Sequence, residues 1–350
     1  MKNGRINSRD VAKIAGVSTS TVSLVVRGSP LVNAATRARV QEVIDQMGYQ
    51  SHAAAAALRS SRANILGYIV PEIIEAVNDV FRHQILSAVI TRTSEENYHV
   101  LVDTFLNTPH HTSLFNSGRI DGALVDWEFD DAMLEELHRR GVPFVLVGRD
   151  VRTIPINWVK VDERGGAYEV TRHLIKLGHT RIALIAGNYP ASKGAEPIKG
   201  GKEASLQRSS GFQRAMNEAR LPIDPRYMVE GDWRYASGLI LGKRLLELHP
   251  RPTAIFALSE VMAVGVLNAA HQLGLRIPED LSVVTTEDSP WVEYVRPQLT
   301  AIHLPIYEVG IRAAEVLMER IENPSMPPQQ IVLPATLVVR ESSAPPGTLD

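Results

Sequence analysis

The sequence predicts an α/β protein in which an N-terminal helix–turn–helix domain precedes two doubly wound lobes. Three observations predict this. Two short helical patterns flank a Gly–Val–Ser turn within residues 10–27, an alanine-rich stretch follows at 51–60, and from residue 64 short apolar runs alternate with helical patterns. Such alternation is typical of parallel sheets with crossover helices. We expect a first domain at 1–50, a linker at 51–62 and the lobes at 63–350.

Composition places the chain among ordinary globular proteins and excludes several chemistries. The 350 residues are 44% apolar and 22% charged, and none is cysteine. The length allows two or three domains with proper cores. Without cysteine there is no disulfide framework, zinc–thiolate site or cysteine nucleophile. We see no signal-peptide pattern and no apolar run of ~18 residues, and therefore expect a cytoplasmic protein without a membrane partner.

Charge is distributed unevenly along the chain. Residues 1–62 hold nine Lys and Arg against three acids, while the whole chain has a net charge of −2. A basic head on an acidic body suggests a module that binds a polyanion such as nucleic acid. The alternative is a basic surface that only contacts solvent, which would show the same charge pattern.

The first helical pattern supplies the start of a helix–turn–helix. Val11, Ile14 and Ala15 have the spacing of one buried helical face. Gly16 is expected to end that helix with a positive φ, and Ser18 is expected to cap the next helix.

The second and third helices complete this domain. Val22, Val25 and Val26 are expected to face inward, which leaves a polar face suited to a major groove. Asn33 is a predicted N-cap for a third helix that ends at Gly48. Its expected buried stripe is Val40, Val43, Ile44 and Met47. The alternative is an ordinary helical hairpin.

The alanine-rich linker has high helix propensity but a single large apolar residue, Leu58. We expect it to be helical only when something holds it. A mere connector is the alternative.

The remaining chain predicts two doubly wound lobes. Predicted strands lie at 65–70, 99–103, 122–125, 144–147, 158–162, 182–186, 227–230, 254–256, 282–285, 299–302, 331–333 and 337–339, with a last long helix at 308–321. We assign 63–160 and 290–325 to the first lobe, and 161–289 and 326–341 to the second. Ligands of such sheets bind outside the carboxyl ends of the strands, and two facing lobes put that crevice between them.

No catalytic constellation is evident. His110 and His111 lack the spacing of metal ligands, and paired acids resemble solvated helix faces. Residues 187–194 lack phosphate-loop spacing, and no GxSxG motif occurs. We expect no enzyme activity, catalytic residue, metal or cofactor.

The whole chain resembles the lactose/galactose repressor family of bacterial transcription regulators. The resemblance rests on the segments 10–23, 36–40, 48–49, 178–183, 208–212, 251–256, 281–284 and 297–300. It implies a headpiece, a hinge helix over 51–62 and a two-lobed effector domain similar to periplasmic sugar-binding proteins, assembled as a homodimer.

The resemblance also implies which residues contact operator DNA: Ser8, Thr19, Ser20, Ser23, Leu24, Arg27, Asn33, Thr36, Tyr49, His52, Ala55 and Leu58. Position 24 is usually arginine in this family and position 27 usually asparagine. Here Leu24 cannot bind guanine bidentately, whereas Arg27 can, so we expect an unusual operator. Leu58 corresponds to the leucine that wedges into the minor groove.

For the effector, the resemblance points to Arg149, Arg208, Trp233, Ser259, Glu287 and Asp288. Arg208 could fork onto hydroxyls or a carboxylate, and Trp233 offers a flat apolar face. Core packing of Trp233 and an ion pair at Arg208 are the alternatives.

We therefore expect a dimeric, nucleoid-associated regulator, a repressor, that binds a pseudo-palindromic double-stranded operator under control of a small polar effector, a sugar or sugar derivative. The rival functions are a solute-binding protein without DNA function, a regulator that responds to a nucleobase, and a sugar-active enzyme.

Overall fold

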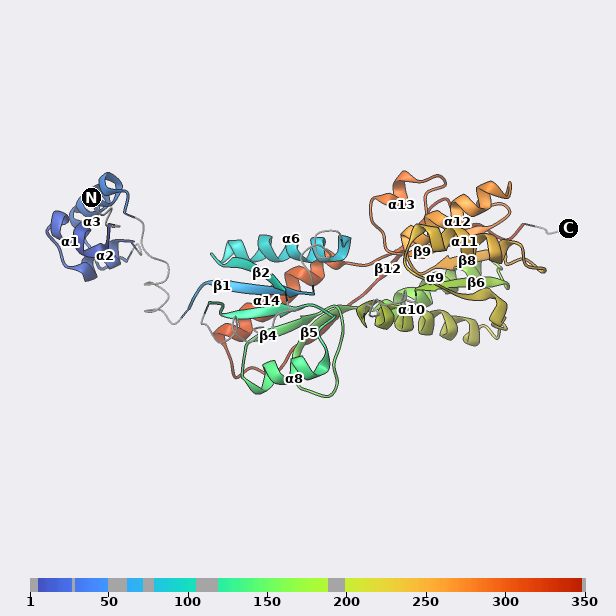
Figure 1. The fold of residues 1–350 in the computed structure, drawn as a ribbon, viewed down its shortest axis with the longest axis horizontal. Helices are drawn as coiled ribbons and strands as arrows, with labels where there is room; N and C mark the ends of the chain where they lie inside the picture. The colour runs from blue at the N-terminus through green and yellow to red at the C-terminus, as the bar shows by residue number, and fades with distance from the viewer. Residues whose placement is uncertain are drawn as a thin grey trace. The chain divides into compact units, whose positions relative to one another are not determined.

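The computed structural model describes residues 6–26, 29–49, 62–71, 79–104, 119–187 and 199–347. The chain divides into two compact units, Met1–Ile65 with Thr112–Asp121, and Leu66–His111 with Gly122–Asp350. The predicted hinge helix lies almost wholly outside the described residues. Figure 1 shows the ribbon of the chain. Among the described residues, no helix has both the length and the apolarity of a membrane span.

The headpiece, residues 6–49, contains three helices: α1 (Ser8–Ala15), α2 (Thr19–Val26) and α3 (Ala34–Met47). The predicted caps are confirmed. Gly16 ends α1 with φ 62°, and the Ser18 hydroxyl accepts a hydrogen bond from the Thr21 N–H at 3.1 Å. At the start of α3, the Asn33 side chain accepts from the Thr36 N–H at 2.8 Å. Short polar side chains therefore accept hydrogen bonds from free backbone N–H groups at the helix starts that the sequence pattern predicted.

Two predictions about the headpiece core are wrong. Ile14 is 60% exposed and Val26 is 41% exposed. Helix α1 packs on both α2 and α3 and buries Ala12 in place of Ile14. This moves the buried face of the helix away from position 14. Val26 is the last residue of α2, at the edge of the core.

The first lobe is built on a sheet with the strand order β11-β5-β4-β3-β1-β2. The strands are β1 (Ile65–Val70), β2 (His99–Thr104), β3 (Gly122–Val125), β4 (Phe144–Val147), β5 (Asn157–Val161) and β11 (Gln330–Leu333). Its helices are α6 (Val80–Glu95), α8 (Asp131–Arg139) and α14 (Ile306–Glu322). Helix α14 packs on α6 and on β3, β4 and β5.

The second lobe has the strand order β12-β10-β9-β8-β6-β7. Its strands are β6 (Ile182–Gly187), β7 (Met228–Gly231), β8 (Ala254–Ala257), β9 (Ser282–Thr286), β10 (Thr300–His303) and β12 (Thr336–Val338). Its helices are α9 (Glu163–Lys176), α10 (Lys199–Glu218), the 3-10 turn Pro225–Tyr227, α11 (Tyr235–Leu246), α12 (Glu260–Gln272) and α13 (Trp291–Tyr294). Figure 1 shows the sheet between the pair α9 and α10 and the pair α11 and α12.

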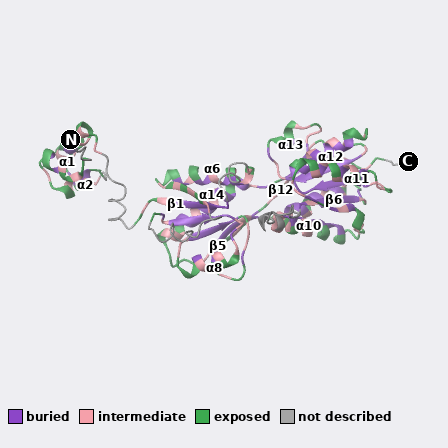
Figure 2. Cartoon of the chain, in the orientation of Figure 1, coloured by how far each residue is buried: buried purple, intermediate pink, exposed green. Residues whose placement is uncertain are grey.

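Both sheets are covered as a doubly wound fold requires. The central strands β3, β4, β8 and β9 are buried along their whole length, as the purple strands of Figure 2 show. All pairings in the second sheet are parallel except that of β10 with β12. The alternating pattern of strands and helices therefore predicted the architecture correctly.

The predicted lobe boundaries are wrong for two strands near the C-terminus. Strand β10 was expected in the first lobe, but it pairs with β9 of the second. Strand β11 was expected in the second lobe, but it pairs in parallel with β5 of the first. Near the C-terminus the chain crosses between the lobes twice, from β10 to α14 and from β11 to β12. A short apolar strand satisfies its backbone hydrogen bonds at either sheet edge, so the local sequence does not identify its partner.

Candidate functional site

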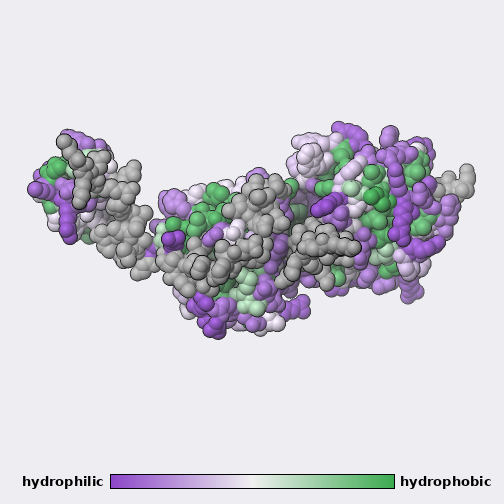
Figure 3. Space-filling model, in the orientation of Figure 1, coloured by the Kyte–Doolittle hydropathy of each residue, from purple (hydrophilic) through white to green (hydrophobic). Residues whose placement is uncertain are grey.

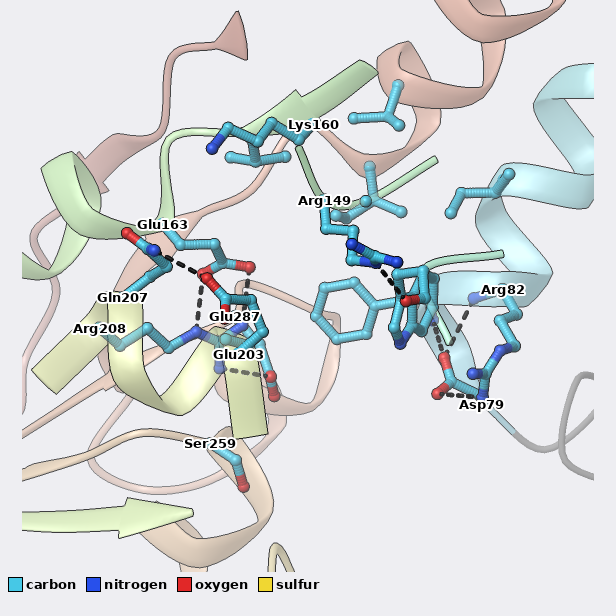
Figure 4. A pocket seen from close by; sticks show the side chains of 18 of the residues that line it. Asp79, Arg82, Arg149, Lys160, Glu163, Glu203, Gln207, Arg208, Ser259 and Glu287 are labelled. Atoms are coloured by element: carbon cyan, nitrogen blue, oxygen red, sulfur yellow. Dashed lines mark hydrogen bonds and ion pairs between the residues drawn. The ribbon is translucent and has the colours of Figure 1, made fainter. Parts of the chain in front are cut away.

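A cavity of about 310 Å³, the inner cavity, lies between the carboxyl edges of the two sheets (Figure 4). The first lobe contributes Phe81, Arg82, Trp127, Glu128 and Arg149, and the second contributes Glu163, Gln207, Arg208, Trp233, Ser259 and Glu287. Most of these residues follow strand ends or begin helices, where the sequence predicted a ligand crevice, whereas Gln207 and Arg208 lie within α10. Arg149, Arg208, Trp233, Ser259 and Glu287 therefore lie together as expected.

Arg208 organises the second-lobe side of the inner cavity. Its side chain is 3% exposed and forms a bidentate ion pair with Glu163, at 2.7 Å from Nε to Oε2 and 3.1 Å from Nη2 to Oε1. Nη1 donates to the Leu258 carbonyl oxygen at 2.6 Å and to Glu287 Oε1 at 3.0 Å. One guanidinium therefore joins the start of α9, the end of β8 and the loop after β9. These contacts agree with the alternative stated above, in which Arg208 forms an ion pair within the protein.

Glu287 is held in an unusual environment at this cluster. Its backbone has φ 74°, a left-handed conformation that only a few non-glycine residues adopt. Burial raises the pKa of the Glu287 carboxyl to about 7, against the lowering effect of the Arg208 guanidinium. Glu260, close behind it at the start of α12, raises this pKa further by charge repulsion. The inner cavity thus contains a carboxyl group that changes charge near neutral pH.

Trp233 forms the aromatic surface of the second lobe. Its indole ring packs on Gly187 at the end of β6, where an added Cβ would lie 2.0 Å from the ring. The Arg208 guanidinium lies 5.7 Å from the ring centroid. The indole N–H is buried and has no hydrogen-bond partner among the described residues. Packing on glycine, rather than hydrogen bonding, therefore sets the orientation of this ring.

The first-lobe side has its own buried arginine, which the sequence reasoning missed. Arg82 is 4% exposed. It pairs bidentately with Asp126, at 2.8 and 3.1 Å, and its Nη2 donates to Glu128 at 2.6 Å. Asp79 lies 3.4 Å from Nη1. Three carboxylates therefore fix this guanidinium within one lobe.

Trp127, also missed, forms the aromatic surface of the first lobe. The Arg82 guanidinium stacks over its ring at 4.3 Å, and the ring packs on Gly148 at the end of β4. Arg149, which was expected to bind the effector, lies beside this ring and donates to the Trp127 carbonyl oxygen at 2.9 Å. Arg149 also pairs with Asp131 at 2.8 Å. The side chain that was expected to bind the effector is thus partly occupied by its own lobe.

Two predicted residues have other contacts. Asp288 is not part of the inner cavity and pairs with Arg340 at 2.7 Å and with His303 at 3.4 Å. Ser259 lines the cavity, but its hydroxyl caps α12 by accepting from the Met262 N–H at 3.2 Å. Arg340 lies far from Asp288 in the sequence, so the resemblance that placed Asp288 with the ligand did not reveal this ion pair.

The predicted DNA contacts lie at different depths in the headpiece. Thr19 and Ser20 are exposed at the start of α2, and Ser8 is half-buried at the start of α1. Leu24 is half-buried and packs on the headpiece core, as does Tyr49. The side chains of Ser23 and Thr36 are half-buried, and that of Asn33 is engaged as the cap of α3. Arg27, His52, Ala55 and Leu58 lie outside the described residues.

No group of three or more His, Asp or Glu side chains in the described part of the chain is arranged to hold a metal ion. A helix–turn–helix headpiece attached to a two-lobed domain with a polar cavity defines a ligand-binding transcription regulator.

Comparison with known proteins gives the family. Residues 8–52 match "Bacterial regulatory proteins, lacI family", and residues 171–343 match "Periplasmic binding protein-like domain". Catabolite control protein A of Priestia megaterium is 31% identical over 95% of this chain and 98% of its own length. The regulator DegA of Bacillus subtilis is 31% identical over 97% and 98%. The chain therefore belongs to the lacI family of bacterial regulatory proteins, and the predicted resemblance is confirmed.

Solved structures agree with this assignment. The Lac repressor dimer bound to operator and the anti-inducer ONPF has a TM-score of 0.82, with 26% identity over 97% of this chain and 100% of that one. The complex of the transcriptional regulator CelR with cellobiose has a TM-score of 0.68, with 31% identity over 97% and 100%. The two-lobed fold and the function as a DNA-binding transcription regulator are thereby confirmed; the family consists of regulators rather than enzymes.

Proposed function

We propose that this chain is a dimeric repressor that binds a pseudo-palindromic operator in the cytoplasm and is controlled by a sugar or sugar derivative in the inner cavity. The observation that carries the proposal is the pairing of two tryptophan faces with buried guanidinium–carboxylate clusters around one cavity. Aromatic faces suit the apolar side of a sugar ring, and carboxylates accept hydrogen bonds from its hydroxyls. We propose no catalytic role for these residues.

Relatives support a sugar effector. One neighbour in structure, CelR, is described in complex with cellobiose, and another, a regulator of Enterococcus faecium, with bound ribose. The second is 26% identical over 80% of this chain, with a TM-score of 0.66. A relative in Haemophilus influenzae is named a ribose operon repressor.

The control mechanism follows from the contacts of the cavity. Its lining comes from both lobes, so a ligand that contacts both stabilises one lobe arrangement over another. The effector changes DNA affinity only to the extent that it binds these arrangements differently. We propose that the dimer transmits this difference to the headpieces.

The test is a binding titration of the full chain on its own upstream DNA at two salt concentrations, repeated with a panel of sugars, polyols, sugar acids and nucleobases. We expect a salt-sensitive specific complex, because Lys and Arg displace counterions from DNA, and we expect one sugar to change its affinity. A specific complex whose affinity no sugar changes would contradict the proposed effector class.

The role proposed for Leu58 has a separate test. Leu58→Ala is expected to reduce specific binding more than non-specific binding, because a minor-groove wedge acts only at the bent operator. Electrophoretic titrations on operator and on random DNA measure both affinities. An unchanged ratio between them would contradict the wedge.

A further inference from the structure

The inner cavity continues into a second cavity of about 510 Å³, the outer cavity. The two share six lining residues, which are Trp127, Glu128, Arg149, Asp150, Glu203 and Gln207. Ligand pockets commonly measure about 300–1,000 Å³, so the inner cavity alone is at the small end of that range. The two together form a site with room for more than one sugar ring.

The first-lobe wall of the outer cavity carries an ion pair between a carboxylate and a guanidinium. Asp131, the first residue of α8, lines the outer cavity but not the inner one. Its carboxylate holds Arg149 Nη2 at 2.8 Å, and its side chain is 53% exposed. Figure 3 shows hydrophilic side chains over α8. This wall therefore presents a carboxylate and a guanidinium side by side, which can accept from and donate to ligand hydroxyls.

The facing wall belongs to α10 of the second lobe. Gln207 Nε2 donates to Glu203 Oε1 at 2.8 Å, and both side chains line both cavities. Figure 4 shows them on the opposite side of the site from Arg149. A ligand that passes from the inner to the outer cavity runs between these two polar walls.

Among the described residues that line this route, charge is predominantly negative. The outer cavity is lined by five carboxylates and two arginines: Glu128, Asp130, Asp131, Asp150 and Glu203, with Arg149 and Arg152. The inner cavity has seven carboxylates and five cations: Asp79, Glu128, Asp150, Asp162, Glu163, Glu203 and Glu287, with Arg82, Arg149, Lys160, Arg164 and Arg208. Carboxylates accept hydrogen bonds from hydroxyl groups but repel anions.

We propose that the effector is an uncharged oligosaccharide of at least two rings. One ring lies between Trp127 and Trp233, and the next lies in the outer cavity against Asp131 and Gln207. This inference rests on the proposed sugar-controlled function and names its ligand class.

The experiment uses the full chain and matched pairs of a monosaccharide and its disaccharide, such as glucose with cellobiose and maltose, galactose with its β-linked dimer, and xylose with xylobiose. Isothermal titration measures affinity, and operator binding in the presence of each sugar measures control. For one pair we expect the disaccharide to bind at least about tenfold more tightly, since each tenfold corresponds to about 1.4 kcal/mol of additional contact.

Asp131→Ala is the discriminating variant, because Asp131 lines only the outer cavity and its partner Arg149 stays held by the carbonyl oxygens of Trp127 and Phe129. It should weaken disaccharide binding about tenfold and leave the monosaccharide affinity within about twofold. Glu135→Ala is the matched control, an exposed carboxylate on the same helix that lines neither cavity. The melting temperature of each variant confirms that it is folded.

The outcomes separate the two proposals. Equal binding of monosaccharide and disaccharide, or an equal effect of Asp131→Ala on both, overturns the outer-cavity inference while the sugar-controlled function stands. Tighter binding of an acidic disaccharide than of its neutral counterpart overturns the uncharged class. If no sugar of either length binds or changes operator affinity, the proposed effector class fails and this inference with it.

Discussion

The two sides of the inner cavity are built to the same plan. In each lobe a tryptophan follows a strand and packs on a glycine at the end of a neighbouring strand, Trp127 on Gly148 and Trp233 on Gly187. In each lobe a buried arginine faces the ring, at 4.3 Å for Arg82 and 5.7 Å for Arg208. Each arginine also forms one bidentate carboxylate pair.

The difference between the two sides lies in the partners of each arginine. Among the described residues, the bonding partners of Arg82 are carboxylates of its own lobe, one of them the fully buried Asp126. Arg208 joins segments after three different elements, and its partner Glu287 has a pKa of about 7. The first-lobe side is therefore a fixed surface, whereas the second-lobe side can change its charge and contacts at neutral pH.

Removal of each arginine gives the largest expected effect and tests this difference. Arg82→Met leaves Asp126 buried without a counter-charge and should cost about 3–5 kcal/mol of unfolding free energy. Arg208→Met should cost about 1–2 kcal/mol less, because Glu287 takes up a proton and Glu163 is 18% exposed to water. Urea unfolding at pH 7 measures both. Equal losses, or a larger loss at Arg208, would remove the distinction between the two sides.

The titration of Glu287 predicts a pH dependence of stability. Its pKa in the folded protein is about 7, above its ordinary 4.5, so the folded state binds a proton more tightly than the unfolded chain between these values. The stability due to this group is complete below pH 4.5 and is lost as the pH rises through 7. The loss amounts to about 3 kcal/mol.

Glu287→Gln isolates this contribution. Between about pH 5 and pH 8 the parent protein should lose more stability than the variant. Burial lowers the pKa of His179, which contributes with the opposite sign, since its stability is lost as the pH falls. His179 is present in both proteins, so its effect cancels in their difference. Parallel urea curves for the two proteins across this range would show that Glu287 does not titrate there.

The two glycines beneath the tryptophans test how each ring is held. Gly187→Ala places a methyl group on the Trp233 ring and should weaken ligand binding about tenfold, with little loss of stability, because only a side chain must move. Gly148→Ala also meets the Trp127 ring, but its φ of 93° strains any other residue. It should lower both ligand affinity and stability, the latter by about 1–2 kcal/mol. Ligand titrations and urea curves on both variants distinguish the cases.

Local sequence patterns predicted most of the fold but not its long-range assignments. The caps at Gly16, Ser18 and Asn33 were correct because each depends on residues within four positions. The buried face of α1 was not, since the core contacts of Ile14 depend on how two other helices cross it. The same limit affected β10 and β11, whose partner sheets are set by tertiary contacts.

The candidate site shows the same division. Arg208 stands in a segment that carries the family resemblance, Trp233 and Glu287 were expected from that resemblance, and the structure places the three residues together. Arg82 and Trp127 carry no local signal, because Asp126 is 44 residues from Arg82 in sequence and only the parallel sheet brings them into contact. The position of Asp288 away from the cavity depends on Arg340, which lies near the end of the chain.

The smallest expected effect concerns the negative charge shared by the two sides. A disaccharide that carries a carboxylate should bind about fivefold more weakly than its neutral counterpart at low salt, since one partly screened repulsion is worth about 1 kcal/mol. The difference should shrink toward 1 M salt, where the screening length is about 3 Å. Asp131→Asn on the first-lobe side and Glu203→Gln on the second-lobe side identify the wall responsible. If Glu203→Gln alone relieves the penalty, the adjustable side also selects ligand charge; if Asp131→Asn does, the fixed side provides specificity and the second lobe provides response.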